Sequence, residues 1–219
     1  RERRETALSV PERIASLLAS ATEILYGLGL GDRVVAVSHE CDFPAEVRDK
    51  PRATFTNIAV GAPSGQIDVE VRELLAAGSP LYEIDVAQLT ALRPDLIVTQ
   101  AQCDVCAVKY DDVLTVVRTT PALESTRVVA LNPQCLDDVF ADIERVGQAV
   151  NRVAEARDYV ARLRDRVEVV RARTAAIPRD QRPIVLACEL AEATFAIPGA
   201  SSIKSLLAQA GVDDLEPLT

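Results

Sequence analysis

Short apolar runs that alternate with helical patterns are the feature that most constrains the fold of this chain. Residues 96–99 follow an Arg-Pro-Asp turn and are all apolar or β-branched, which is typical of a short strand buried on both faces. Similar runs occur before and after it, so strands are predicted at residues 14–18, 34–38, 96–99 and 128–131. Because helical patterns separate these runs, the sequence predicts an α/β fold with a parallel, doubly wound sheet.

Helical patterns fill most of the remaining sequence. Helices are predicted at residues 21–28, 67–77, 86–92, 110–119 and 136–148, and a single continuous helix at 151–175. Ser20 and Glu23 have the Ser-x-x-Glu spacing of a capping box, which predicts that the first helix begins directly after Ser20. Residues 52–66 contain Gly, Pro and Asn, and we expect them to form an irregular loop.

Charge and hydropathy restrict the partners of the chain. The formal net charge is −9, so no nucleic-acid partner is expected. No apolar run reaches the roughly 18 residues that a membrane-spanning helix needs. Residues 1–5 are charged and no apolar stretch follows directly, so no signal peptide is visible.

Five cysteines follow the ends of predicted strands: Cys41, Cys103, Cys106, Cys135 and Cys188, the last after a fifth predicted strand at 184–187. In a parallel sheet such strand ends share one edge, and His39, the only histidine, is predicted at the same edge. Thiolate and imidazole are ligands that zinc favours, so His39, Cys41, Cys103 and Cys106 form a candidate zinc site. A single Cys-x-x-Cys is a weaker zinc signal than a pair, and buried free thiols are the alternative.

No catalytic constellation is recognisable in the sequence. Ser16 and Ser20 lack a Gly-x-Ser-x-Gly elbow, and no glycine-rich phosphate loop occurs. The Cys-x-x-Cys is predicted in a loop, with Asp104 between the thiols, rather than at the start of a helix as in thioredoxin-like proteins. We therefore expect a protein that is not an enzyme.

Three stretches carry a resemblance to a known family: residues 14–24, residues 29–44 with His-Glu-Cys-Asp, and residues 92–108 with Cys-Asp-Val-Cys-Ala-Val. They resemble vitamin B12 (cobalamin)-type periplasmic substrate-binding proteins, which supply iron-complex and cobalamin ABC transporters. The resemblance covers residues 14–175 well and residues 184–212 loosely. It implies a non-enzymatic protein that binds cobalamin, another corrinoid or a related metal chelate, and that has an ABC transporter permease as partner. The zinc-binding protein remains the alternative.

The resemblance also implies an organisation into parts. These are an N-terminal α/β lobe at 14–150, a long connecting α-helix at 151–178 and a short, incomplete second α/β lobe at 183–219, with the ligand in the cleft between the lobes. Only about 37 residues are present for the second lobe, fewer than a domain that folds alone usually has. We expect this segment either to dock on the first lobe or to self-associate with a second molecule. The resemblance implies a periplasmic or extracytoplasmic location, whereas the absence of a visible signal peptide leaves the cytoplasm open.

The strand ends and the resemblance together give the candidate ligand-binding residues. They lie at the start of the first helix, after the predicted strands and near one aromatic side chain. The set is Ser20, Thr22, His39, Glu40, Cys41, Asp42, Tyr82, Gln100, Gln102, Cys103, Asp104, Cys106, Cys135 and Glu189.

Overall fold

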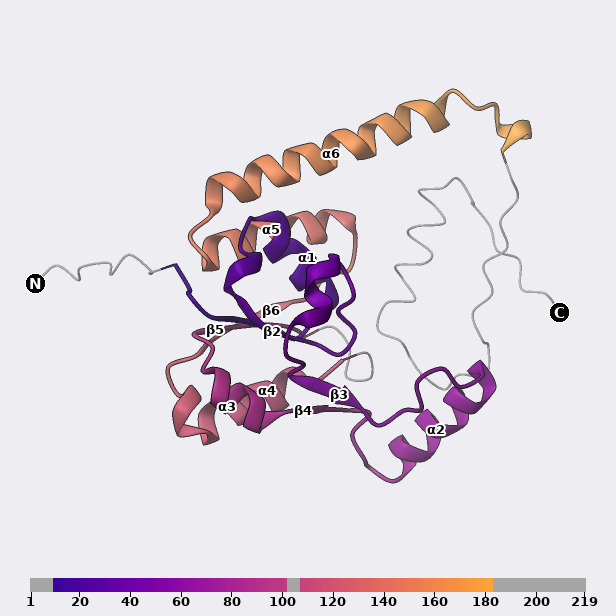
Figure 1. Ribbon diagram of the computed structural model, residues 1–219. Coiled ribbons are helices and arrows are strands. Elements are labelled where there is room, and N and C mark those ends of the chain that lie inside the picture. The colour runs from indigo at the N-terminus through magenta and orange to yellow at the C-terminus, as the bar shows by residue number, and fades with distance from the viewer. Residues whose placement is uncertain (1–9, 102–106, 183–219) are drawn as a thin grey trace, which may run out of the picture.

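A parallel sheet with helices on both faces forms the centre of the molecule (Figure 1). The computed structural model describes residues 10–101 and 107–182. Within them, the strands are β1 (Ile14–Ser16), β2 (Val34–Val37), β3 (Thr54–Thr56), β4 (Tyr82–Ile84), β5 (Leu96–Gln100) and β6 (Arg127–Leu131). The α-helices are α1 (Ala19–Gly27), α2 (Ser64–Ala76), α3 (Val86–Leu92), α4 (Tyr110–Thr119), α5 (Leu136–Ala149) and α6 (Val153–Ala175), and the 3₁₀ helices are Gly31–Arg33, Ala45–Asp49, Pro121–Leu123 and Arg179–Gln181.

The strand order of the main sheet is β2-β1-β5-β6, and all its pairs are parallel. Ser16 is in register with Val37 of β2 on one side and with Val98 of β5 on the other. This order is the doubly wound arrangement in which the connections reverse direction between β1 and β5. The predicted α/β fold with a parallel, doubly wound sheet is confirmed.

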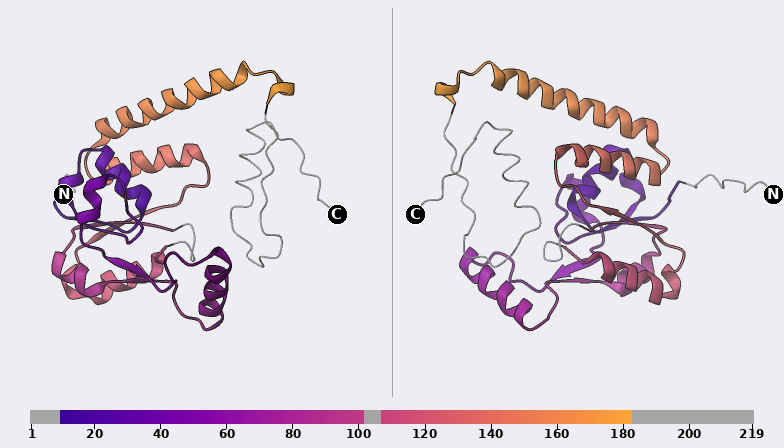
Figure 2. Two further views of the ribbon diagram at one scale, coloured as in Figure 1. Left: turned by 45° about the vertical axis from the view of Figure 1, so that its right-hand side comes forward. Right: turned by 180° about the vertical axis from the view of Figure 1, so that it is seen from behind.

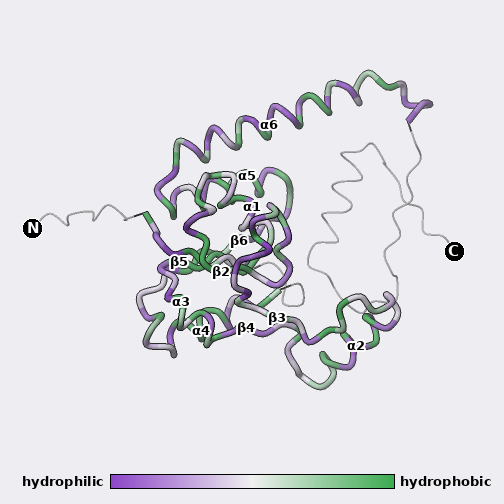
Figure 3. Tube along the Cα trace, in the orientation of Figure 1, coloured by the Kyte–Doolittle hydropathy of each residue, from purple (hydrophilic) through white to green (hydrophobic). Residues whose placement is uncertain are grey.

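Each face of the sheet has its own hydrophobic core. Alternate residues of β5 face opposite sides, so Val98 packs with α1 and α5, whereas Ile97 packs with the helices α3 and α4. Both side chains are fully buried. Figure 3 shows hydrophobic residues concentrated in the sheet, while polar and apolar residues mix along α6. The main sheet is therefore buried on both faces, as its continuous apolar strands predict.

Helix α6 forms an outer layer on α5 and continues past it (Figures 1 and 2). Its 23 residues correspond to a length of about 35 Å. The buried residues of α6 are Ala156 and Val160, both in its first half, where Ala156 packs directly against Gly147 of α5. The predicted helix at 151–175 is confirmed as one continuous helix, but it begins two residues later, at Val153. Asn151 lies before it and has a φ of 55°, which is not helical.

Two local expectations were wrong. Residues 52–66 are not an irregular loop, because they contain β3, which pairs antiparallel with β4, and the start of α2. Helix α1 begins at Ala19, with Leu18 as a cap residue that makes no side-chain cap bond, so Ser20 and Glu23 form no capping box.

The predicted second lobe at 183–219 lies outside the described residues. No helix of the described chain is long and apolar enough to cross a membrane.

Candidate functional site

The carboxyl ends of β1, β2, β5 and β6 meet along one edge of the sheet because these strands are parallel. Open α/β sheets bind ligands at this edge, next to the point where the connections reverse direction. We call it the carboxyl edge and define it by the described residues 17–20, 38–44, 107–112 and 132–138. It includes the start of α1, the loop after β2, and the starts of α4 and α5.

Buried hydroxyl groups of β1 and α1 hold the loop after β2 on its inner side. The Oγ1 of Thr22 donates to the Oγ of Ser16 at 2.8 Å and lies 3.1 Å from the Sγ of Cys41. All three side chains are at most 1% exposed, and burial raises the pKa of the Cys41 thiol. Cys41 therefore sits in the protein interior as a neutral thiol that anchors the loop to α1.

His39 anchors the same loop to the hairpin formed by β3 and β4. Its Nδ1 lies 2.8 Å from the Oγ1 of Thr54, and its backbone N–H donates to the same oxygen at 3.1 Å. Its ring stacks on Tyr82, with ring centroids 5.4 Å apart, and its Nε2 lies 3.2 Å from the Oε1 of Glu40. Burial, supported by the charge of Arg52, lowers the pKa of His39 despite the opposing effect of Glu40. The imidazole is consequently neutral near pH 7.

Side chains alternate in direction along the loop after β2. His39 and Cys41 point into the protein, while Glu40, with 66% of its side chain exposed, and Asp42 are at the surface. The guanidinium of Arg52 fixes the backbone by donating to the carbonyl oxygens of Ser38 and Cys41 at 2.9 and 2.7 Å. The loop thus presents two carboxylates and is itself held rigidly.

The start of α5 forms the other side of the edge. The backbone N–H of Asp138 donates to the Cys135 side chain, and the Asp138 carboxylate accepts from the N–H of Gln134 at 2.9 Å and of Cys135 at 3.2 Å. The Gln134 N–H is the first cause of a lowered Asp138 pKa. A capping box, which the sequence predicted for Ser20 at α1, thus occurs instead between Cys135 and Asp138 at α5. Cys135 is exposed.

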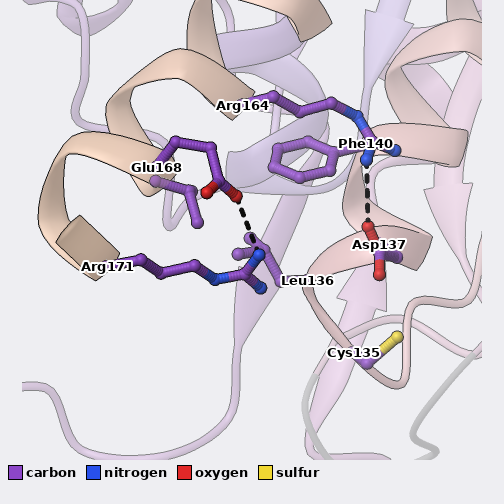
Figure 4. A pocket seen from close by; sticks show the side chains of 8 residues that line it. Cys135, Leu136, Asp137, Phe140, Arg164, Glu168 and Arg171 are labelled. Carbon is purple, nitrogen blue, oxygen red and sulfur yellow. Dashed lines mark hydrogen bonds and ion pairs between the residues drawn. The ribbon is translucent and has the colours of Figure 1, made fainter. Parts of the chain in front are cut away.

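A small pocket lies beside this edge, between α5 and α6 (Figure 4). It has a volume of about 230 Å³, and Cys135 and Phe140 belong to its lining. Arg164 lies 3.4 Å from the carboxylate of Asp137 and also stacks over Phe140, 4.7 Å from the ring centre. Arg171 lies 2.8 Å from Glu168. Each arginine of the pocket thus faces a carboxylate.

The structure brings most of the described candidate residues to one edge in different roles. Ser20, Glu40, Asp42 and Cys135 are exposed there, His39 and Tyr82 are half-buried, and Thr22, Cys41 and Gln100 are buried. Gln102, Cys103, Asp104, Cys106 and Glu189 lie outside the described residues, so their roles stay predictions. Among the residues that the structure covers, no three His, Cys, Asp or Glu side chains form a group able to hold a metal ion.

Sequence reasoning missed Thr54 and Arg52, which organise the loop after β2. Thr54 is 3% exposed and also donates to the Oγ of Ser38 at 3.2 Å. The imidazole of His39 lies between the hydroxyl of Thr54, 2.8 Å from its Nδ1, and the carboxylate of Glu40, 3.2 Å from its Nε2. Because Thr54 is buried, its hydroxyl is not an accessible nucleophile, and these contacts act as a structural network. Both residues come from a segment predicted to be irregular, and no local signal marks them.

Comparison with known proteins supports the fold and identifies the family. The chain is 31% identical over 98 residues to the vitamin B12-binding protein of Vibrio campbellii, covering 39% of this chain and 36% of that protein. The crystal structure of the periplasmic vitamin B12 binding protein BtuF of Vibrio cholerae superposes with a TM-score of 0.53 at 23% identity, over 76% of this chain and 52% of that one.

A second solved structure has the same fold. The apo form of the periplasmic heme-binding protein RhuT from Roseiflexus sp. RS-1 gives a TM-score of 0.55 at 19% identity, covering 77% of this chain and 52% of that one. The chain thus spans about a third of its sequence relative and half of these structures. The family described as periplasmic binding protein matches residues 14–217, and the chain belongs to that family.

Proposed function

We propose that this chain is a non-enzymatic substrate-binding protein of an ABC transporter, which binds a corrinoid or a related metal chelate. The observation that carries the proposal is the rigid carboxyl edge, where exposed polar side chains belong to a loop that buried hydrogen bonds hold in place. Glu40 and Asp42 are exposed, while the two side chains that alternate with them, His39 and Cys41, are fixed from opposite sides by Thr54 and Thr22. Preformed polar groups of this kind are what orient a ligand in a binding site.

The ligand class follows from the relatives. Vitamin B12-binding proteins are among the sequence relatives, and binding proteins for vitamin B12 and heme share the fold. The ligand would lie on the carboxyl edge, with the start of α1 and the loop after β2 on one side and the start of α5 on the other. A permease would be the partner, and an extracytoplasmic site of action follows from the same proposal. Residues 14–150, 151–178 and 183–219 would be its lobe, connecting helix and partial second lobe.

Equilibrium dialysis against cyanocobalamin tests this proposal, because a corrinoid absorbs in the visible where the protein does not. We expect saturable retention of one ligand per chain. Ser20→Tyr, which adds bulk at the exposed start of α1, should weaken retention at least about tenfold by steric exclusion from the edge. Ser64→Tyr is the matched control, since Ser64 is also an exposed serine in the first turn of a helix, α2. Equal loss in both variants, or no retention by the unmodified chain, would refute the proposal.

A further inference from the structure

A groove of about 600 Å³ lies between α1, the 3₁₀ helix Gly31–Arg33, the segment at 43–50 and α6. Tyr26, Phe43 and Tyr159 contribute aromatic rings to its lining, and each comes from a different one of these segments. The two tyrosines are half-buried, whereas Phe43 is 63% exposed. Aromatic rings that gather in a groove while one of them stays exposed are typical of a docking surface rather than of a core.

Close packing on glycine holds the two tyrosine rings in place. A Cβ at Gly27 would lie 2.5 Å from the ring of Tyr159, and a Cβ at Gly31 would lie 2.6 Å from the ring of Tyr26. A larger residue at either position would displace the ring that covers it. The groove therefore has its aromatic walls before any partner docks.

The charge of the groove is mainly negative. Glu23, Asp32 and Glu46 belong to its lining, and within residues 10–101 and 107–182 their carboxylates have no hydrogen-bond or ion-pair partner. Burial raises the pKa of Tyr26, and the charges of Glu46 and Asp32 raise it further. Carboxylates from two segments thus act on the same phenol, and a cationic partner would meet both.

The basic side chains at the groove are already engaged. The Nζ of Lys50 donates to the carbonyl oxygen of Gly31 at 3.2 Å, and the guanidinium of Arg162 lies over the ring of Tyr159, 5.6 Å from its centre. The second contact places a guanidinium on one of the aromatic rings of this groove. Further arginines suit the other rings and the carboxylates, because guanidinium groups stack on aromatic faces and pair with carboxylates.

The chain itself carries such arginines next to the groove. Residues 1–9 directly precede the described residues and contain three arginines and two glutamates, a positive balance. The described chain begins beside the groove, because Arg33 donates to the carbonyl oxygen of Pro11 at 2.8 Å and its neighbour Asp32 belongs to the groove lining. An extended chain spans about 3.3 Å per residue, so six residues of this segment reach about 20 Å. The segment is therefore long enough to lie across the groove.

We propose that residues 1–9 dock in this groove, with their arginine side chains on its aromatic rings and against its carboxylates. The inference goes beyond the proposed function and does not depend on it. Docking would join α1, the segment at 43–50 and α6, and would hold Phe43 and Pro44 at the end of the loop after β2. Because one chain supplies both partners, the effective concentration is high, and contacts that are weak singly are sufficient.

Trypsin cleavage after Arg3 and Arg4, followed by mass spectrometry, tests the proposal on the full chain. The reference is a free peptide of residues 1–9. We expect cleavage of the chain to be at least about tenfold slower than cleavage of the peptide, because the protease acts on the undocked population. Raising the salt concentration from about 0.02 M to about 0.5 M should narrow this difference, since the screening length falls from about 20 Å to about 4 Å.

Charge-neutral variants assign the protection to the groove without changing the cleavage sites. Asp32→Asn/Glu46→Gln should bring the cleavage rate to within about threefold of the peptide, since the undocked population grows. Asp112→Asn/Glu124→Gln is the matched control. It also removes two exposed carboxylates, but beside helices that pack on the opposite face of the sheet from α1. It should leave the protection unchanged.

Hydroxyl-radical footprinting measures the other side of the contact. In Arg1→Gln/Arg3→Gln/Arg4→Gln, oxidation of Phe43 should rise at least about twofold, because the docked population falls. Phe55 is the internal control, since it is also an exposed phenylalanine, on β3, and does not line the groove. Its oxidation should not change.

Each outcome decides one point. Cleavage of the full chain as fast as that of the peptide overturns the docking. Protection that increases with protein concentration overturns docking within one chain, because a second molecule then supplies the segment. Undiminished protection in Asp32→Asn/Glu46→Gln, or unchanged oxidation of Phe43 in the arginine variant, overturns the assignment to this groove. All of these results leave the proposed function standing.

Discussion

The Nδ1 of His39 and the Oγ1 of Thr54 lie 2.8 Å apart, and this contact joins the loop after β2 to the hairpin of β3 and β4. Thr54 also accepts from the His39 backbone N–H and donates to Ser38. One hydroxyl therefore orders a loop that is distant from it in sequence. The exposed carboxylates of the carboxyl edge depend on this arrangement for their position.

Thr54→Val should destabilise the protein by about 1–3 kcal/mol, because it leaves buried polar groups of His39 and Ser38 without their partner. Urea unfolding followed by circular dichroism measures the change. Thr115→Val is the control, since Thr115 is exposed on α4 and its hydroxyl donates to the carbonyl oxygen of Asp111 within the helix. Its effect should stay within about 0.5 kcal/mol. Equal effects of the two substitutions would contradict the role assigned to Thr54.

His39 should make stability depend on pH in the mildly acidic range. The pKa of its imidazole is lowered by burial first and by Arg52 second, while Glu40 opposes both. Tyr82 and Thr54 are the other groups that face the ring. The unfolded chain therefore takes up a proton first, near its ordinary pKa of about 6.5, and stability is lost as the pH falls below that value.

The pH effect has a direct readout, because His39 is the only histidine in the chain. The imidazole proton signals in an NMR titration should give a pKa below about 6.5. In parallel, His39→Gln should unfold with less pH dependence between about pH 5 and 6.5 than the unmodified protein, since the carboxylates common to both cancel in the comparison. A pKa at or above the ordinary histidine value would contradict the neutral, buried ring.

Cys41 and Cys135 should differ in reactivity. Cys41 is 1% exposed and burial raises the pKa of its thiol, whereas Cys135 is exposed. Because the thiolate is the reactive form, iodoacetamide should label Cys135 in the folded protein and Cys41 only after denaturation. Mass spectrometry of the separate peptides gives both extents in one experiment. Labelling of Cys41 at a rate similar to that of Cys135 would show that the loop after β2 opens readily.

Gly147→Ala should weaken the packing of α6 on α5. A Cβ at Gly147 would overlap the Cβ of Ala156 and lie 3.1 Å from the carbonyl oxygen of Arg152. We expect destabilisation of about 1–3 kcal/mol from overpacking, measured by urea unfolding. Gly65→Ala on α2 is the control, because no atom lies within 4 Å of the added Cβ. Helix propensity favours alanine at both sites by up to about 1 kcal/mol. A Gly147→Ala protein whose free energy of unfolding equals or exceeds that of the unmodified chain would therefore contradict this packing.

The four strands of the main sheet and most helices could be predicted because each has a local signal. Helix α4, for example, has the predicted bounds, since its apolar residues recur at helical spacing and its ends are well marked. Strand β3 gave no such signal, because its pairing with β4 depends on residues far along the chain. The Ser20–Glu23 pattern failed for a tertiary reason: Thr22 bonds to Ser16 and Cys41 in the core, and the helix begins before Ser20.

The sequence predicted that the described candidate residues meet at one edge of the sheet, but not the directions of their side chains. Parallel strands bring residues 38–44 and 132–138 to one edge, which the order of strands and helices predicts. The inward direction of His39 depends on Thr54 and Tyr82, and that of Cys41 on Thr22. A zinc site that includes these two residues was a reasonable hypothesis from ligand chemistry. Within the described residues, these two side chains contact the hydroxyl groups of Thr54 and Thr22, the ring of Tyr82 and the carboxylate of Glu40. The zinc site stays a prediction, because Cys103 and Cys106 lie outside the described residues.

Amide hydrogen exchange with and without cyanocobalamin tests the central claim most directly, because it reports binding and its location together. If the ligand lies on the carboxyl edge, exchange should slow at residues 17–20, 38–44 and 132–138 and stay unchanged in α2 and α3. Absence of any protection at saturating cyanocobalamin, or protection confined to the distal half of α6, would contradict a binding site at this edge.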